Sequence, residues 1–159
     1  FGENSGISPG LFASVSTSTE PVKVGSQFLL TVRVKDPSLR DSTDPRFNEV
    51  FPIGVTFNEY QGPAPVAFTG HPENIVLTPP KVLNEPVSLC QGCTMQGKED
   101  GPNFVSVPGG EGLARVYATF SESGDYIIHA RVDNFQAPDS TQNNQCCWTN
   151  VFQKITVIP

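Results

Sequence analysis

Three stretches of this chain alternate apolar and polar residues with a period of two, and this alternation limits the fold more than any other feature. In residues 27–35 (QFLLTVRVK), every second residue from Phe28 to Val34 is apolar. A period of two places such side chains on one face of a β-strand. Residues 53–60 and 123–133 show the same pattern, so the sequence predicts half-buried strands in all three stretches.

The rest of the chain extends this all-β prediction. Further strands are expected at 12–16, 113–121 and 148–158, and short edge strands at 74–78 and 82–89, where neighbouring prolines would interrupt a central strand. The 15 Pro and 14 Gly are spread along the chain, which favours short strands separated by turns and long loops over helices. The 159 residues fit a single domain, 1–159, with 1–18 as an extended N-terminal arm.

Charge and hydropathy exclude two classes of interaction. The net charge of −6 arises from 16 acidic and 10 basic residues, and the basic residues form no run or stripe. Proteins that bind nucleic acid or anionic membranes through phosphate contacts need such a stripe. No stretch approaches the roughly 20 apolar residues of a membrane-spanning helix. We therefore expect neither a nucleic-acid partner nor a membrane span in this chain.

The segment 122–134 (ESGDYIIHARVDN) resembles strand F and the corner before it in bacterial immunoglobulin-like and PKD-like domains. The resemblance implies an immunoglobulin-like sandwich of two antiparallel sheets. In those families the hydroxyl of a tyrosine ties the corner to the backbone, and Tyr126 would take that role. Ile128 stands where antibody-type domains carry the strand-F cysteine, so their buried inter-sheet disulfide is not expected here.

Four cysteines form two tight clusters, Cys90 with Cys93 and Cys146 with Cys147. An even cysteine count in an exported protein indicates disulfides. A bond between Cys146 and Cys147 would join Cα atoms only about 3.8 Å apart, below the usual disulfide range. We expect two disulfides between the clusters, each closing a loop of about 55 residues. The alternatives are free or redox-active thiols and a four-cysteine zinc site.

This cysteine framework indicates an extracytoplasmic location, either secreted, at the cell surface or in the periplasm. The sequence contains no Asn-x-Ser/Thr sequon, which favours a bacterial source. Neither His71 nor His129 has a nucleophile at a recognisable motif nearby. We therefore expect no catalytic residue, no enzyme activity and no cofactor.

Two groups of side chains carry alternative interpretations. Oxygen-bearing side chains at Asp133, Asn134 and Asp139 could hold calcium, but they lack the D-x-D-x-D-G spacing and are also common in turns. Four aromatic residues could either stack on a sugar or fill the core: Tyr60, Phe68, Phe135 and Trp148.

The N-terminal arm carries four apolar side chains: Ile7, Leu11, Phe12 and Val15. Either residues 12–16 pair within their own sandwich as its first strand, or the arm adds to a sheet edge of a neighbouring copy and builds filaments. The sequence thus indicates an exported, non-enzymatic structural or protein-interaction module of a surface assembly, whose partners are other protein subunits or copies of itself. A carbohydrate-binding module or an accessory subunit of a larger complex is the alternative.

Overall fold

The computed structural model describes residues 11–15, 18–37, 43, 45, 50–74, 101–134, 137 and 148–159. The described chain is all-β, as the sequence predicts. Its strands are β1 (Phe12–Val15), β2 (Val22–Lys23), β3 (Gln27–Lys35), β4 (Ile53–Gln61), β5 (Val66–Gly70), β6 (Phe104–Val107), β7 (Glu111–Phe120), β8 (Gly124–Asp133) and β9 (Trp148–Ile158). A short 3₁₀ turn, η2 (Pro108–Gly110), joins β6 to β7. Among the described residues no helix is long and apolar enough to cross a membrane.

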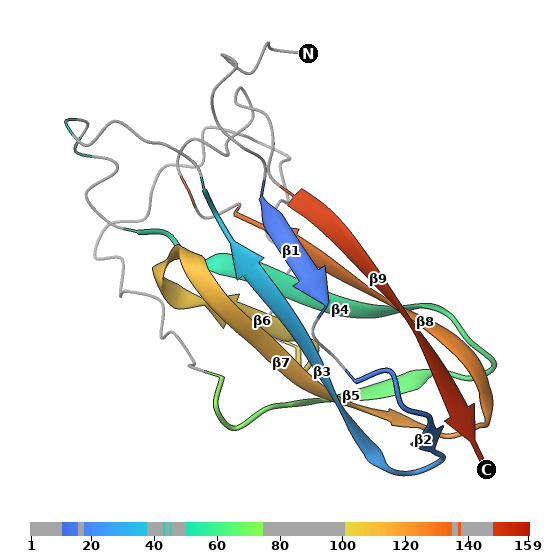
Figure 1. Cartoon of the computed structure of the whole chain (residues 1–159). Helices are drawn as coiled ribbons and strands as arrows, with labels where there is room; N and C mark the ends of the chain where they lie inside the picture. The colour runs from blue at the N-terminus through green and yellow to red at the C-terminus, as the bar shows by residue number, and fades with distance from the viewer. Residues whose placement is uncertain are drawn as a thin grey trace, which may run out of the picture.

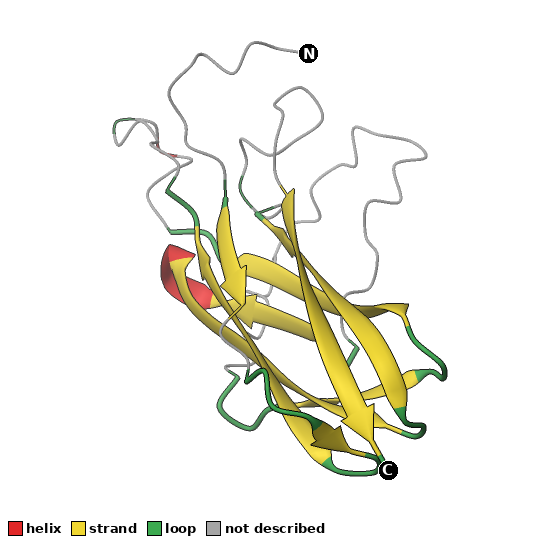
Figure 2. Ribbon diagram, turned by 45° about the vertical axis from the view of Figure 1, so that its right-hand side comes forward, coloured by secondary structure: helices red, strands yellow, loops and turns green. Residues whose placement is uncertain are grey.

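The strands form two sheets that pack face to face (Figure 1 and Figure 2). One sheet has four strands in the order β1-β3-β7-β5, and the other has five in the order β2-β9-β8-β4-β6. Neighbouring strands are antiparallel, except that β2 runs parallel to β9. The first part of the chain therefore contributes β1 to one sheet and β2 to the other.

The core lies between the sheets and is built from the faces that the alternation predicts. In β3, Leu30, Val32 and Val34 are buried, while Phe28 is partly buried and packs against them. The other predicted apolar faces behave in the same way, and they contribute Ile53, Val55, Phe57, Tyr126, Ile128, Ala130 and Val132 to the core. Burial of these side chains is the main source of stability for such a sandwich.

A tight turn at Val24-Gly25 joins β2 to β3. The backbone N–H of Ser26 donates to the carbonyl of Lys23 over 3.1 Å, which closes a β-turn between β2 and β3. Gly25 occupies the third position with φ of 76°, a conformation that glycine adopts without steric cost.

Three strands, β2, β5 and β6, were not expected from the sequence. Each is short, and each has turn-forming residues beside it: Pro21 before β2, Pro65 before β5 and Gly101-Pro102 before β6. A strand of two to five residues shows too little alternation to stand out from a loop. The edge strands expected at 74–78 and 82–89 lie outside the described residues, apart from Asn74, which lies in the turn after β5.

Tyr126 anchors the corner between β7 and β8. Its ring is fully buried, with its centroid 4.7 Å from that of Phe120, and its hydroxyl donates to the carbonyl of Glu122 over 3.0 Å. Gly62, in the loop after β4, packs on the same ring so closely that a Cβ there would lie 2.6 Å from Cε1 of Tyr126. The corner therefore joins two loops through one aromatic ring.

Candidate functional site

An aromatic row crosses the outer face of the five-stranded sheet. We use this name for Tyr60 on β4, His129 on β8 and Phe152 on β9. The Tyr60 and Phe152 rings meet edge to face, with centroids 5.2 Å apart and an interplanar angle of 74°. The His129 ring stacks on Phe152, with centroids 5.0 Å apart and an angle of 30°. Three neighbouring strands thus each contribute one ring.

The strand pairing explains why these rings meet. On β8, Ile128 and Ala130 point into the core, so His129 between them points outward. The register places Phe152 directly opposite His129. On β4 the register shifts between Glu59 and Gln61, and this bulge re-aims Tyr60 across the face of β8.

The row is open to solvent. Tyr60 is 67% exposed and Phe152 is 53% exposed. Large aromatic side chains usually gain more by burial than by exposure, so two such rings in contact on a surface are a candidate binding site.

Amide side chains border the aromatic row. Oδ1 of Asn150 lies 2.7 Å from Nε2 of His129, and because an amide oxygen accepts, the imidazole donates this hydrogen bond through Nε2. The bond fixes the plane of the imidazole ring against Phe152. Asn58 on β4 lies opposite His129 in the register and is exposed, which places a second amide beside the row.

Trp148 extends the exposed aromatic surface along β9. It is 61% exposed and shares the outer face of the strand with Asn150 and Phe152, because alternate residues of a strand point the same way. Trp148 and Phe152 are four positions apart along the strand, a span of about 13 Å. The surface is therefore long enough to contact several residues of a partner.

Paired charges flank the row on both sides. Nζ of Lys154 lies 2.8 Å from Asp125, and the Thr156 hydroxyl donates to the same carboxylate over 3.0 Å. The hydrogen bond from Lys154, followed by that from Thr156, lowers the pKa of Asp125 below its ordinary value. On the other side, Arg131 lies 3.5 Å from Asp133. An apolar centre with a polar rim is the usual layout of a protein interface.

The structure separates the four aromatic residues singled out in the sequence. Tyr60 and Trp148 are exposed on one face, whereas Phe68 of β5 packs against the core. Phe135 lies outside the described residues. Phe152 was missed, although it lies on the same face of β9 as Trp148, between Asn150 and Lys154.

The oxygen-rich end of β8 forms internal contacts. Nδ2 of Asn134 donates to the Asp36 carboxylate over 3.1 Å, and Asp133, which is buried, pairs with Arg131. Among the described residues no cluster of three or more His, Cys, Asp and Glu side chains could hold a metal ion. Asp139, the third residue of the expected calcium set, lies outside the described part of the chain.

The remaining residues of interest are dispersed. His71 follows β5 in the other sheet, where its ring lies 5.1 Å from that of Tyr117 and its Nδ1 accepts the N–H of Glu73. Phe12 and Val15 belong to β1, which pairs with β3 of the same chain, and Leu11 directly precedes it. Ile7 and all four cysteines, Cys90, Cys93, Cys146 and Cys147, lie outside the described residues.

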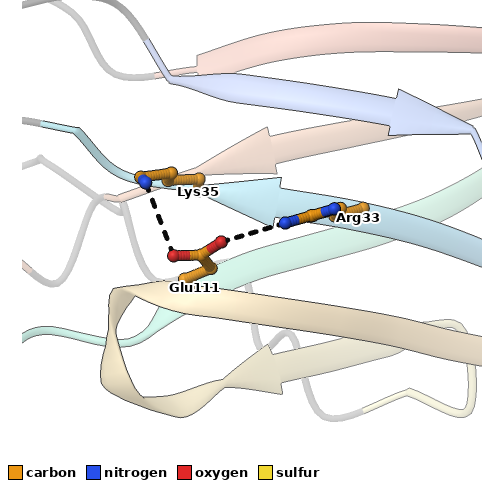
Figure 3. Close-up of polar contacts among 3 residues, drawn as sticks. All are labelled: Arg33, Lys35 and Glu111. Carbon is orange, nitrogen blue, oxygen red and sulfur yellow. Dashed lines mark hydrogen bonds and ion pairs between the residues drawn. The ribbon is translucent and has the colours of Figure 1, made fainter.

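The outer face of the four-stranded sheet has a different character. Figure 3 shows Glu111 of β7 between two cations of β3: Arg33 at 3.2 Å and Lys35 at 3.5 Å. The hydrogen bond from Arg33 is the main cause that lowers the pKa of Glu111, and the charge of Lys35 adds to it. All three side chains are about half exposed. Charge dominates this end of the four-stranded sheet, whereas aromatic rings lie at the centre of the five-stranded one.

No protein-family model matches the sequence, and no curated protein matches it. The fold is similar to that of a conjugative transposon lipoprotein from Bacteroides eggerthii, at 9% identity and a TM-score of 0.48 over 91% of this chain and 95% of that one. It is also similar to a structure from the AAF fimbriae of enteroaggregative Escherichia coli, whose study concerned fibronectin binding and biofilm formation. That structure has 11% identity and a TM-score of 0.43 over 94% of this chain and all of its own. We draw no functional conclusion from either similarity.

Proposed function

We propose that this protein is a non-enzymatic, extracytoplasmic interaction module that contacts a partner protein through the aromatic row. The observation that carries the proposal is the exposure of Tyr60, Phe152 and Trp148 on one face of one sheet. Tyrosine and tryptophan supply much of the binding energy of protein interfaces because they offer large, stiff contact surfaces. The paired charges around the row would form the polar rim.

The fold itself fits an immunoglobulin-like sandwich. The order β1-β3-β7-β5 corresponds to the A-B-E-D sheet of constant-type domains, and the hydrogen bond of Tyr126 has the geometry of their tyrosine corner. β6 departs from that pattern, because it follows β5 in the chain but pairs with β4 in the other sheet. Such sandwiches serve many functions, so the site and not the fold must carry the functional argument.

The absence of enzyme activity is also a proposal, and it rests on the surroundings of the two histidines. His129 contacts Asn150 and Phe152, and His71 contacts Tyr117 and Glu73. None of these neighbours is a serine, threonine or cysteine that a histidine could activate as a general base. The extracytoplasmic location rests on the cysteine clusters and their expected cross-cluster disulfides.

The partner can be trapped by photo-crosslinking. A benzoylphenylalanine placed at position 152 should crosslink to a specific protein in the envelope or secreted fraction of the source cells. The same probe at Gln27, on the outer face of the other sheet, is the matched control and should not. Tyr60→Ala should lower the crosslinking yield at position 152. Equal yields from positions 152 and 27 would contradict the proposal.

Carbohydrate binding is the second candidate, because Tyr60 and Trp148 share a face with the amides of Asn58 and Asn150. A sugar ring stacks on a flat aromatic face, but the Tyr60 and Phe152 rings are inclined at 74° to each other and do not form one platform. This geometry favours the protein partner. A glycan array probed with the wild type and with Trp148→Ala separates the two candidates. A sugar site predicts that the wild type binds a glycan and that the variant does not, whereas a protein interface predicts no glycan binding by either.

A further inference from the structure

We propose that the protein forms a two-fold symmetric dimer in which β5 pairs antiparallel with β5 of a second copy, so that two four-stranded sheets become one continuous sheet. The proposal concerns a different surface from the aromatic row and is independent of the proposed function. It rests on backbone groups of Phe68 and Gly70 at the edge of the four-stranded sheet.

The hydrogen bonding of β7 shows which way the groups of β5 point. The carbonyl of Phe120 accepts the N–H of Gly25 on the β3 side of β7, whereas the carbonyl of Arg115 accepts the side-chain amide of Asn74 on the β5 side. Because alternate residues of an antiparallel ladder bond to opposite neighbours, Tyr117 and Thr119 face β5.

The partners of these two residues in the register are Thr69 and Ala67. The alternate residues of β5, Val66, Phe68 and Gly70, therefore direct their N–H and C=O groups away from the sheet. The N–H of Val66 donates to the carboxylate of Glu59 over 3.0 Å, which confirms this direction. In the described part of the chain no hydrogen bond reaches the outward groups of Phe68 and Gly70.

One register of self-pairing matches this pattern. If Thr69 lies on the two-fold axis, Phe68 stands opposite Gly70 of the partner subunit, and the two residues exchange both of their hydrogen bonds. Val66, whose N–H is already bonded to Glu59, then lies beyond this ladder pair, because β5 of the partner subunit ends at its Gly70.

The surroundings of β5 are compatible with a neighbouring strand. A Cβ built at Gly70 would meet no atom within 4 Å beyond its chain neighbours, so the face of the sheet at this position is open to side chains of a partner strand. The five residues of β5, VAFTG, carry no charge and no proline, which are the usual devices that keep an edge from pairing. On the axis, two threonines would face each other, and such cross-strand pairs are favourable.

The opposite side of the sandwich is closed. There β1 and β9 come within 8 Å of each other between Cα atoms, which is too close for another strand to fit between them. The two-fold contact is therefore assigned to β5, the strand at the other edge of the four-stranded sheet.

A charge-swap experiment on Thr69 tests the dimer. Thr69 is exposed, so Thr69→Lys and Thr69→Glu should fold normally, which circular dichroism checks. Each places two like-charged side chains directly opposite each other at the axis, on Cα atoms about 4.5 Å apart. We expect each variant alone to dimerise at least about tenfold more weakly than the wild type, and an equimolar mixture of the two to recover the dimer as a heterodimer.

The measurement is sedimentation equilibrium of the full chain up to its highest soluble concentration, because an interface below about 1,200 Å² gives a weak complex. Gln27→Lys, which adds the same charge at an exposed position of the interior strand β3, is the matched control and should dimerise like the wild type. A wild type that stays monomeric at all concentrations, a control that also loses the dimer, or a mixture that fails to recover it overturns the proposal.

Discussion

The carboxylate of Glu59 accepts a hydrogen bond from the backbone N–H of Val66 over 3.0 Å. Glu59 lies near the end of β4 in the five-stranded sheet, and Val66 is the first residue of β5 in the four-stranded sheet. One side chain therefore fixes the point at which the chain crosses between the layers. It also occupies the outward donor of β5 that would otherwise be left without a partner.

Replacing Glu59 should destabilise the protein by an amount that depends on whether the new side chain can still accept the hydrogen bond from Val66. Glu59→Ala leaves a partly buried N–H unpaired and should lower the free energy of unfolding by about 1–3 kcal/mol. Glu59→Gln keeps a carbonyl acceptor and should cost less than half as much. Urea denaturation followed by fluorescence measures both, and equal losses for the two variants would show that the hydrogen bond to Val66 has little importance.

Tyr126 should contribute mainly through its ring. Tyr126→Phe removes only the hydrogen bond to Glu122 and should cost about 1 kcal/mol. Tyr126→Ala also removes the buried ring and should cost about 3–5 kcal/mol. The same denaturation measurement distinguishes them. If the phenylalanine variant lost as much stability as the alanine variant, the corner would depend on the hydroxyl and not on packing.

Two aromatic residues of β4 should behave in opposite ways. Phe57 is 1% exposed and Tyr60 is 67% exposed. Phe57→Ala creates a cavity in the core and should cost about 3–5 kcal/mol. Tyr60→Ala removes one surface ring contact and should cost less than about 1.5 kcal/mol. A thermal melt of each variant checks the contrast, and a large loss for Tyr60→Ala would indicate that the aromatic row serves stability and not binding.

The ion pairs of Glu111 should be visible in its titration. Because Arg33 and Lys35 lower the pKa of Glu111 in the folded state, their contribution to stability is present above the ordinary glutamate pKa. It is lost as the pH falls through the lower, folded-state value. Arg33→Gln should raise the Glu111 pKa more than Lys35→Gln does, because the Arg33 hydrogen bond is the larger cause. Carbon-detected NMR titration of the carboxyl group measures both, and the reverse order would contradict this assignment.

The cysteine prediction can be checked chemically. A thiol assay on denatured, unreduced protein should find no free thiol, and peptide mapping should join Cys90 and Cys93 to Cys146 and Cys147 in either cross-cluster pairing. A peptide that contains a Cys146–Cys147 bond, or one equivalent of bound zinc, would show instead that the clusters do not cross-link as expected.

The positions and inward faces of the long strands could be predicted because alternation is a local property of the sequence. Residues 27–35 and 148–158 become β3 and β9 with the expected bounds. β5 and β6 could not be predicted in this way, because a strand of four or five residues owes its conformation to the neighbour it pairs with. Ser106, for example, is extended because it pairs with Gly54, and nothing local distinguishes it from a loop residue.

The candidate site shows the same division. The sequence could single out Tyr60 and Trp148 as candidate surface aromatic residues, but it did not single out Phe152, which lies on the same face of β9 as Trp148. It could not bring Tyr60 and Phe152 into contact, since 92 positions separate them and their meeting depends on β8 lying between β4 and β9. Pairing over such a separation is a property of the whole fold.

The parallel pairing of β2 with β9 bears on how this sandwich would respond to mechanical load. Val22 pairs with Val157 and Lys23 with Ile158, and the N–H of Val24 donates to the carbonyl of Ile158 over 2.9 Å. Suppose that β2 were pulled from its N-terminal end and β9 from its C-terminal end. Because the two strands are parallel, these ends lie at opposite ends of the ladder, and the force would shear β2 along β9. The hydrogen bonds between β2 and β9 would then carry the force together instead of breaking one after another. This pairing would therefore resist extension of the domain.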